Sequence, residues 1–160
     1  MSKTKKRLLF VCLGNICRSP AAEGVMRKLV DDAALTDEYF IDSAGIGSWH
    51  VGQLPDQRMR RCGASRGYDF SSHARQISAD DFSCFDLILV MDKENLRIVR
   101  GMAPDYDSSQ RVRLLASYCT QHPGTTVIPD PYYGDESDFN YALDLVEDAC
   151  AGLLDNLNKE

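Results

Sequence analysis

The segment with the clearest chemical potential runs from Cys12 to Ser19. It reads Cys-Leu-Gly-Asn-Ile-Cys-Arg-Ser, a cysteine separated by five residues from an arginine and a serine. Five residues allow the backbone to curl so that its N–H groups aim at one centre, and such a nest at a helix N-terminus binds a tetrahedral oxyanion. Gly14 and Asn15 tolerate the left-handed conformations that the curl needs. Arg18 adds a planar fork that takes two phosphate oxygens at once.

Cys12 is placed to act as a nucleophile below that anion centre. The loop amides and the charge of Arg18 favour thiolate over thiol, and thiolate is the attacking form in covalent phosphoryl transfer. The ordinary alternative is a small buried hydrophobe at a strand end, which the flanking turn and helix signals disfavour. Ser19 has two competing roles, because its one hydroxyl can donate to the Cys12 sulfur or cap the helix that begins at Ser19-Pro20. The sequence leaves both roles open.

The elements that must position this loop alternate between strand and helix. Short apolar runs predict strands at residues 8–12, 39–44, 86–91 and 112–117. Periodic apolar residues and capping signals predict helices after Ser19-Pro20 and at residues 55–66, 94–102 and 139–157. This alternation is typical of an α/β fold in which helices cover both faces of a parallel sheet. Ligands bind such sheets at the carboxyl ends of the strands, which is where Cys12 lies.

Composition disfavours several other classes of protein. The chain has 160 residues, 44% hydrophobic and 26% charged, as in an ordinary globular domain. A net charge of −6 disfavours nucleic acid and anionic membranes as partners. The longest apolar run, residues 8–13, is too short to span a bilayer, and no signal-peptide cleavage site follows it. The six cysteines lack C-x2-C spacing and the three histidines are scattered, so we expect no metal site, and reduced thiols in a cytoplasmic protein.

Five motifs together resemble the low-molecular-weight protein tyrosine phosphatase family. They read Val-Cys-Leu-Gly-Asn-Ile-Cys-Arg-Ser-Pro, Asp-Ser-Ala-Gly, His-Ala-Arg, Val-Met-Asp and Asp-Pro-Tyr, at residues 11–20, 42–45, 73–75, 90–92 and 130–132. Their order and spacing are those of the family, and the match covers essentially the whole chain. The resemblance implies one phosphatase domain over residues 1–160, with a flexible basic N-terminus at residues 1–6. It also implies a three-layer fold whose four-stranded parallel sheet has the flavodoxin-like order 2-1-3-4.

The resemblance further implies a role for each matching residue. Cys12 is implied as the nucleophile, Arg18 as the phosphate ligand, and Asp130 as the general acid and then base. The implied reaction hydrolyses protein phosphotyrosine and small aryl phosphates through a phosphocysteine, without metal or cofactor. The implied phosphate-binding and support residues are Leu13, Gly14, Asn15, Ile16, Cys17, Ser19, Ser43, His73 and Asp92. The implied walls of the substrate pocket are Leu13, Trp49, Tyr132 and Tyr133.

Two finer expectations come from the same resemblance. Asn15, Ser43 and His73 are expected to hydrogen-bond one another and so to hold the loop. Cys17 is expected to form a disulfide with Cys12 under oxidation, which would protect the nucleophile from over-oxidation. The alternative, that Cys17 merely packs behind the loop, stays open. The remaining thiols are interpreted as structural: Cys62, Cys84, Cys119 and Cys150.

The expected partners are phosphotyrosine-containing proteins, with a tyrosine kinase among the candidates, and phosphate or another oxyanion in the site. We expect a monomer or a weak homodimer. One rival hypothesis is a thioredoxin-coupled arsenate reductase, which needs a redox cysteine near the end of the third strand; Asp92 stands there, and Cys84 precedes the strand. The other is a non-catalytic phosphate-binding module, which would not need Cys12 and Asp130 together.

Overall fold

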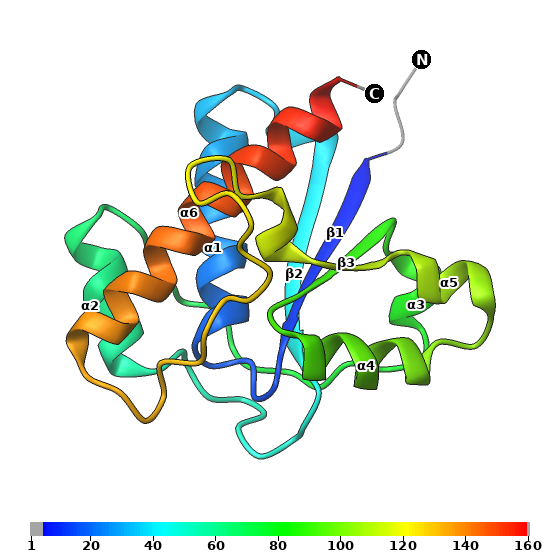
Figure 1. The fold of residues 1–160 in the computed structure, drawn as a ribbon, viewed down its shortest axis with the longest axis horizontal. Coiled ribbons are helices and arrows are strands. Elements are labelled where there is room, and N and C mark those ends of the chain that lie inside the picture. The colour runs from blue at the N-terminus through cyan, green and yellow to red at the C-terminus, as the bar shows by residue number, and fades with distance from the viewer. Residues whose placement is uncertain (1–4, 160) are drawn as a thin grey trace.

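The computed structural model describes residues 5–159. At its centre is one sheet of four strands: β1 (Lys6–Cys12), β2 (Tyr39–Gly45), β3 (Leu87–Val90) and β4 (Val112–Leu114). The strands are all parallel and lie in the order β2-β1-β3-β4 (Figure 1). Because they are parallel, their carboxyl ends share one edge of the sheet. The predicted α/β fold and its strand order 2-1-3-4 are confirmed.

Helices cover both faces of the sheet, as predicted. α1 (Arg18–Asp32), α2 (Gln57–Ser65) and α6 (Glu136–Asn158) lie on one side in Figure 1, and α3 (Asp81–Cys84), α4 (Lys93–Met102) and α5 (Tyr106–Gln110) lie on the other. Two 3-10 turns, η1 (Thr36–Glu38) and η2 (Leu115–Tyr118), are also present. None of the helices within residues 5–159 has the length and apolar character needed to cross a membrane.

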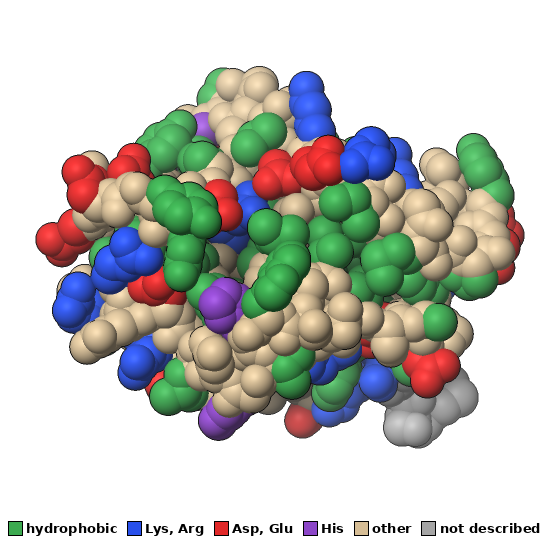
Figure 2. Space-filling view, turned by 90° about the horizontal axis from the view of Figure 1, so that it is seen from below, with side chains coloured by type: hydrophobic (Ala, Val, Ile, Leu, Met, Phe, Trp, Pro, Cys, Tyr) green, Lys and Arg blue, Asp and Glu red, His purple; other side chains and the backbone are tan. Residues whose placement is uncertain are grey.

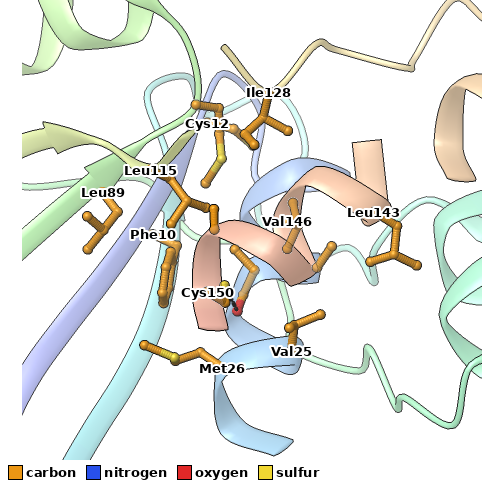
Figure 3. Close-up of a cluster of buried hydrophobic side chains, with 14 of the residues drawn as sticks. Phe10, Cys12, Val25, Met26, Leu89, Leu115, Ile128, Leu143, Val146 and Cys150 are labelled. Atoms are coloured by element: carbon orange, nitrogen blue, oxygen red, sulfur yellow. Dashed lines mark hydrogen bonds between the residues drawn. The ribbon is translucent and has the colours of Figure 1, made fainter. Parts of the chain in front are cut away.

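Strand β1 ends at Cys12 and so places this residue at the shared edge of the sheet. The strand is held in position because its side chains alternate between two hydrophobic cores. Leu8 and Phe10 belong to the core beneath α1 and α6, whereas Leu9 and Val11 belong to the core beneath α3 and α4. All four side chains are fully buried. Figure 3 shows the larger core, with Phe10 among side chains of α1 and α6 and with Cys12 at one end.

Several predicted boundaries were wrong. The helix predicted at residues 139–157 begins at Glu136, because the Asp135 carboxylate accepts the backbone N–H of Ser137 at 3.0 Å and so caps it. The strand predicted at residues 112–117 ends at Leu114, because the apolar residues that follow are buried in the η2 turn rather than in the sheet. The helix predicted from residue 55 begins at Gln57, because the Asp56 carboxylate accepts the backbone N–H of Arg58 at 2.8 Å and so caps it. Lys6 belongs to β1 rather than to a flexible terminus. Lys5 is exposed and precedes the strand, and the rest of that terminal prediction, residues 1–4, falls outside the described residues.

One carboxylate on α6 anchors the segment that leads from η2 towards Asp130. The Asp148 side chain is 5% exposed, and its oxygens lie 3.0–3.1 Å from three successive backbone N–H groups, those of Thr120, Gln121 and His122. The Nδ1 atom of His122 lies 2.8 Å from the same carboxylate. Burial alone would raise the pKa of Asp148, but the hydrogen bonds from His122 and the backbone outweigh burial and hold that pKa well below its usual range.

Replacing Asp148 by alanine should destabilise the fold by about 3 kcal/mol at neutral pH, because three successive backbone N–H groups and the His122 ring lose a shared, buried acceptor. Folding lowers the pKa of Asp148, so its stabilising contribution is complete above the unfolded pKa of about 4 and is lost as the pH falls towards the folded value. Urea denaturation should therefore show the gap between wild type and Asp148→Ala narrowing from about pH 5 to about pH 3.

The matched control for that measurement is Asp155→Ala, which removes an exposed carboxylate from the same helix. It should change the free energy of unfolding by less than about 0.5 kcal/mol. A gap between wild type and Asp148→Ala that stays constant across this pH range would contradict the assigned role of the carboxylate.

Candidate active site

The loop between β1 and α1 has its carbonyls fixed on the outer side. Three of them accept backbone hydrogen bonds at 2.7–3.0 Å: Cys12 from Ile46, Leu13 from Gly47, and Ile16 from Asp56. The N–H and C=O groups of a trans peptide point in opposite directions, so the N–H group of each of these peptide units is turned inward. The loop and the N-terminus of α1 therefore have the backbone geometry of a nest, which suits an oxyanion.

The Cys12 thiol lies on the floor of this loop and is 3% exposed. Its Sγ atom is 3.0 Å from the Oγ atom of Ser19, whereas the Ala44 carbonyl is 3.4 Å from that Oγ. Ser19 is not the helix cap, because α1 begins one residue earlier and has Cys17 at the N-cap position. Of the two roles that the sequence left open, the structure supports the contact with the sulfur.

Asn15 joins the loop to the rest of the fold. Its backbone is left-handed, with φ at 58°, and its side chain is buried. The Nδ2 group donates to Ser19 at 2.8 Å and to Ser43 at 3.0 Å, and Oδ1 accepts the backbone N–H of Arg75 at 3.0 Å. Gly45 permits this approach, because a Cβ atom there would lie 3.0 Å from the Asn15 nitrogen and 2.9 Å from a neighbouring backbone carbon.

This network ends at a carboxylate that the sequence did not reveal. Ser43 donates to the Oε1 atom of Glu23 at 2.5 Å, and Oε2 pairs with Arg27 at 2.7 Å. Glu23 is 2% exposed, and burial raises its pKa although the Ser43 hydrogen bond opposes the rise. A continuous chain of side chains thus links the Cys12 sulfur to a buried acid. The available signal was a glutamate four residues after Ser19 and four before Arg27 on a helix with an apolar face.

His73 lies outside this network, contrary to the prediction. Its side chain is exposed, and in the described part of the chain it is not a partner of Asn15 or Ser43. The motif was nevertheless correctly located, because the neighbouring Arg75 reaches Asn15 through its backbone N–H. The Arg75 guanidinium then pairs with Asp42 at 3.0 Å, which holds the segment against β2.

Arg18 is held from three sides at the edge where β1 and β3 end. Its side chain is 3% exposed. Nη1 donates to Asp92 at 2.7 Å and to the Ile128 carbonyl at 2.9 Å, and Nη2 lies 3.7 Å from the Asp130 carboxylate. Asp92 also caps α4, where it accepts the backbone N–H of Asn95 at 2.8 Å. These contacts bring together three residues that the sequence analysis singled out: Arg18, Asp130 and Asp92.

A cavity of about 320 Å³ opens above the loop. Its floor includes Cys12 and Arg18, and its walls consist of Leu13, Trp49, His50, Asp130, Tyr132 and Tyr133. Figure 2 looks onto this end of the molecule and shows hydrophobic side chains around a hollow. The four predicted wall residues therefore lie together. His50 was not predicted, although it directly follows Trp49; its Nδ1 atom is 3.1 Å from the Oε1 atom of Gln53.

The other thiols do not form a second reactive centre. Burial raises the pKa of the Cys17 thiol far above its usual range, and acidic neighbours such as Asp56 add to the effect. Cys84 is exposed on α3, before β3 begins, while the end of β3 is followed by Asp92. Within residues 5–159 there is no cluster of three or more histidine, cysteine or acidic side chains able to hold a metal ion.

A thiol beneath an oxyanion nest at the carboxyl edge of a parallel sheet is the arrangement expected of an enzyme that acts on phosphate esters. The family model described as low molecular weight phosphotyrosine protein phosphatase matches residues 7–160. The chain belongs to the low molecular weight phosphotyrosine protein phosphatase family and is therefore an enzyme, a hydrolase of phosphotyrosine in proteins.

Individual proteins are similar to this chain in sequence and in fold. The chain is 42% identical to the low molecular weight phosphotyrosine protein phosphatase of Sus scrofa, over 95% of this chain and 96% of that protein. A crystal structure of a protein tyrosine phosphatase from Entamoeba histolytica, with Hepes in the active site, superposes with a TM-score of 0.93 at 45% identity and covers 97% of this chain and 98% of that one. A Drosophila arginine phosphatase superposes with a TM-score of 0.87 at 35% identity and covers 94% of this chain and 96% of that one.

Replacing Asn15 should separate its hydrogen bonds from its backbone strain. Asn15→Gly keeps the left-handed backbone relaxed but removes the side-chain bonds, so kcat/KM for an aryl phosphate should fall roughly 10- to 100-fold. Asn15→Ala should lose a similar amount of activity. Its free energy of unfolding should be about 1 kcal/mol lower than that of Asn15→Gly, because alanine is strained in the left-handed conformation. Steady-state kinetics and urea unfolding measure the two effects.

Ala34 offers a matched control, since it is left-handed at φ 59° outside the site. Ala34→Gly should stabilise the protein by up to about 1 kcal/mol and leave the kinetics unchanged. Full activity in both Asn15 variants would show that the network does not position the loop.

Proposed function

We propose that this phosphatase hydrolyses protein phosphotyrosine, and small aryl phosphates, through a phosphocysteine formed on Cys12. The observation that carries the proposal is the convergence of one thiol, one guanidinium and one carboxyl on a single cavity with aromatic walls. Cys12 lies on the floor, Arg18 lies beside it, and Asp130 faces them from the wall. Membership of the phosphotyrosine phosphatase family supports the same reaction.

In the first step, the Cys12 thiolate attacks phosphorus in line with the leaving oxygen. The sulfur–phosphorus bond forms as the phosphorus–oxygen bond breaks, and Asp130 donates its proton to the departing phenolate oxygen. Arg18 and the inward-facing N–H groups hold the three equatorial oxygens and stabilise their charge. Donation from Ser19, 3.0 Å from the sulfur, stabilises the thiolate before attack.

In the second step, water hydrolyses the phosphocysteine. Asp130, now a carboxylate, takes a proton from the attacking water, the sulfur–phosphorus bond breaks, and the Cys12 thiolate is restored as phosphate leaves. Ser19 again stabilises the departing sulfur. Neither step calls for a metal ion or a cofactor, because the arginine and the backbone dipoles supply the positive charge that phosphoryl transfer needs.

The apolar wall favours an aryl phosphate as substrate. Trp49 and Tyr133 are 67% and 95% exposed, and Tyr132 packs edge-on against Tyr133 with ring centroids 5.0 Å apart. These rings can stack on a phenyl ring, which a phosphoserine side chain lacks. The Drosophila neighbour makes phosphoarginine the competing substrate to test.

Cys17 is proposed as the partner of Cys12 under oxidation. Both thiols are free and buried within the same short loop. The raised pKa of Cys17 keeps its sulfur protonated and so less open to oxidation. Cys12 would therefore be oxidised first, by an oxidant such as a peroxide, to a sulfenic acid. The Cys17 sulfur would lose its proton as it attacks this sulfenic acid, the sulfur–sulfur bond would form, and water would leave.

We also propose a domain organisation, a cellular setting and partners for the enzyme. Residues 1–160 are taken as a single phosphatase domain that acts in the cytoplasm, in signalling, as a monomer or a weak homodimer. Phosphotyrosine proteins, a tyrosine kinase among them, are the proposed substrates. Six free cysteines support a reducing compartment.

Cys12→Ser should abolish turnover of p-nitrophenyl phosphate, with a loss of at least about 10³-fold, because the hydroxyl is not ionised near neutral pH. Asp130→Ala should lose about 10²–10⁴-fold in kcat/KM on phenyl phosphate, a poor leaving group, and much less on p-nitrophenyl phosphate. The assays are run with chelator present. Activity of Cys12→Ser, or equal losses of Asp130→Ala on both esters, would refute the mechanism.

Trp49→Ala should raise KM for phosphotyrosine about 5- to 10-fold with little change in kcat, because one stacking wall is removed. Tyr106→Ala, which removes an exposed ring on α5, is the control and should change neither constant. Free phosphoarginine is assayed beside phosphotyrosine. A higher kcat/KM for phosphoarginine would overturn the proposed substrate.

A further inference from the structure

Arg58 is fixed in place by its neighbour Asp56 in the first turn of α2. Its Nε and Nη2 atoms lie 3.1 Å and 3.0 Å from the two carboxylate oxygens, a bidentate ion pair. Burial would raise the pKa of Asp56, but the hydrogen bonds from Arg58 outweigh it and hold that pKa below its usual value. The guanidinium also lies 4.5 Å from the ring centre of Phe139 on α6. Its fork is therefore held in one orientation.

The same guanidinium also hydrogen-bonds the segment that carries Asp130. Nη2 donates to the Tyr132 carbonyl at 2.9 Å, and Nη1 lies 3.4 Å from the Gly134 carbonyl. The segment is a tight turn, closed by a bond of 2.8 Å from the Gly134 N–H to the Pro131 carbonyl. The backbone N–H of Tyr132 donates to the Asp130 carboxylate at 3.1 Å. Fixing the Tyr132 peptide thus fixes a direct partner of the proposed acid.

Asp56 connects these contacts of Arg58 to the oxyanion loop. Its backbone N–H donates to the Ile16 carbonyl at 2.7 Å, which is one of the bonds that turn the loop N–H groups inward. The Asp56–Arg58 pair therefore spans from the floor of the cavity to the wall that bears Asp130. The other contacts that join this wall to Arg18 are the Ile128 carbonyl, at 2.9 Å, and the Asp130 carboxylate, which is 39% exposed and 3.7 Å away.

Arg58 is poorly placed to bind the phosphate itself. It lines a separate cavity of about 210 Å³, together with Arg61, Cys62 and Glu136, and does not line the cavity above Cys12. Its charge is also compensated by the bidentate pair with Asp56. What the guanidinium can do is to hold two carbonyls in fixed positions.

We propose that Arg58, oriented by Asp56, is the positioning residue that holds the Asp130 turn over Cys12, a role that rests on the proposed acid function of Asp130. It acts through the carbonyls of Tyr132 and Gly134. A proton donor displaced by about 1 Å can cost up to about 100-fold in rate, so the effect falls on the step that needs the proton.

The test compares Arg58→Met and Arg58→Lys with wild type on a series of aryl phosphates. Methionine keeps an apolar stem against Phe139, and lysine keeps the charge but not the fork. Both variants should lose about 10- to 100-fold in kcat/KM on phenyl phosphate and less than about 3-fold on p-nitrophenyl phosphate. The inhibition constant of inorganic phosphate should stay within about 2-fold, because the floor is intact.

Arg61→Met is the matched control, since Arg61 is an exposed arginine on the same helix. It should behave as wild type on every ester. Circular dichroism and thermal unfolding verify that each variant is folded. If Arg58→Met does not fold, Arg58→Lys carries the test alone. Full activity of Arg58→Lys on phenyl phosphate would show that charge rather than geometry matters, and would overturn the proposal.

A double-mutant cycle with Asp130→Ala separates this proposal from the proposed function. If Arg58 acts through Asp130, adding Arg58→Met to Asp130→Ala should cost less than about 2-fold further on phenyl phosphate. Additive losses would overturn the positioning role while leaving the acid role intact. If Asp130→Ala alone lowers kcat/KM by the same factor on phenyl phosphate and on p-nitrophenyl phosphate, the proposed acid function fails instead.

Discussion

The buried charge of Arg18 is the constraint on which the site depends. A guanidinium that is 3% exposed is costly unless charged and polar partners surround it, and here Asp92 and the Ile128 carbonyl do so at 2.7 Å and 2.9 Å. These partners belong to different connections of the sheet, one after β3 and one on the segment that leads to Asp130. The contacts that satisfy the charge therefore also fix the floor of the cavity against its wall. The site is complete only when this edge of the sheet is assembled.

The loop itself is held by polar contacts from outside it. Asn15 keeps a left-handed backbone that costs most residues about 1–2 kcal/mol, and its side-chain amide is bonded on both sides. Behind it, Ser43 ends on the buried Glu23, which is itself paired with Arg27. Because each polar group has a partner, the network can be buried at low cost and can hold the inward-facing N–H groups ready for an oxyanion.

How well the sequence predicted the site depended on the distance of each contact along the chain. The oxyanion loop lies within eight consecutive residues, so the spacing of its cysteine, arginine and serine was enough to predict it. Glu23 meets Ser43 across 20 residues, and Arg58 meets Tyr132 across 74, and no local pattern reveals such pairs. The His73 prediction failed because a motif locates a segment without showing which of its atoms faces the loop. Short elements such as α3, α5 and η1 were missed because three to five residues hold too little periodicity.

An acidic protein can select a phosphate dianion because the attraction acts only at short range. The net charge is −6, and the charge of Arg18 is partly offset by Asp92, so the protein does not draw anions from a distance. The favourable field comes from N–H groups that converge within the cavity, where a low dielectric strengthens them. In the proposed binding mode, a phosphate group is stabilised within the cavity, whose wall includes the exposed rings of Trp49 and Tyr133. On the proposed mechanism, a molecule that contacts both the aromatic rim and the nest gains both interactions, which favours an aryl ester over a free anion of equal charge.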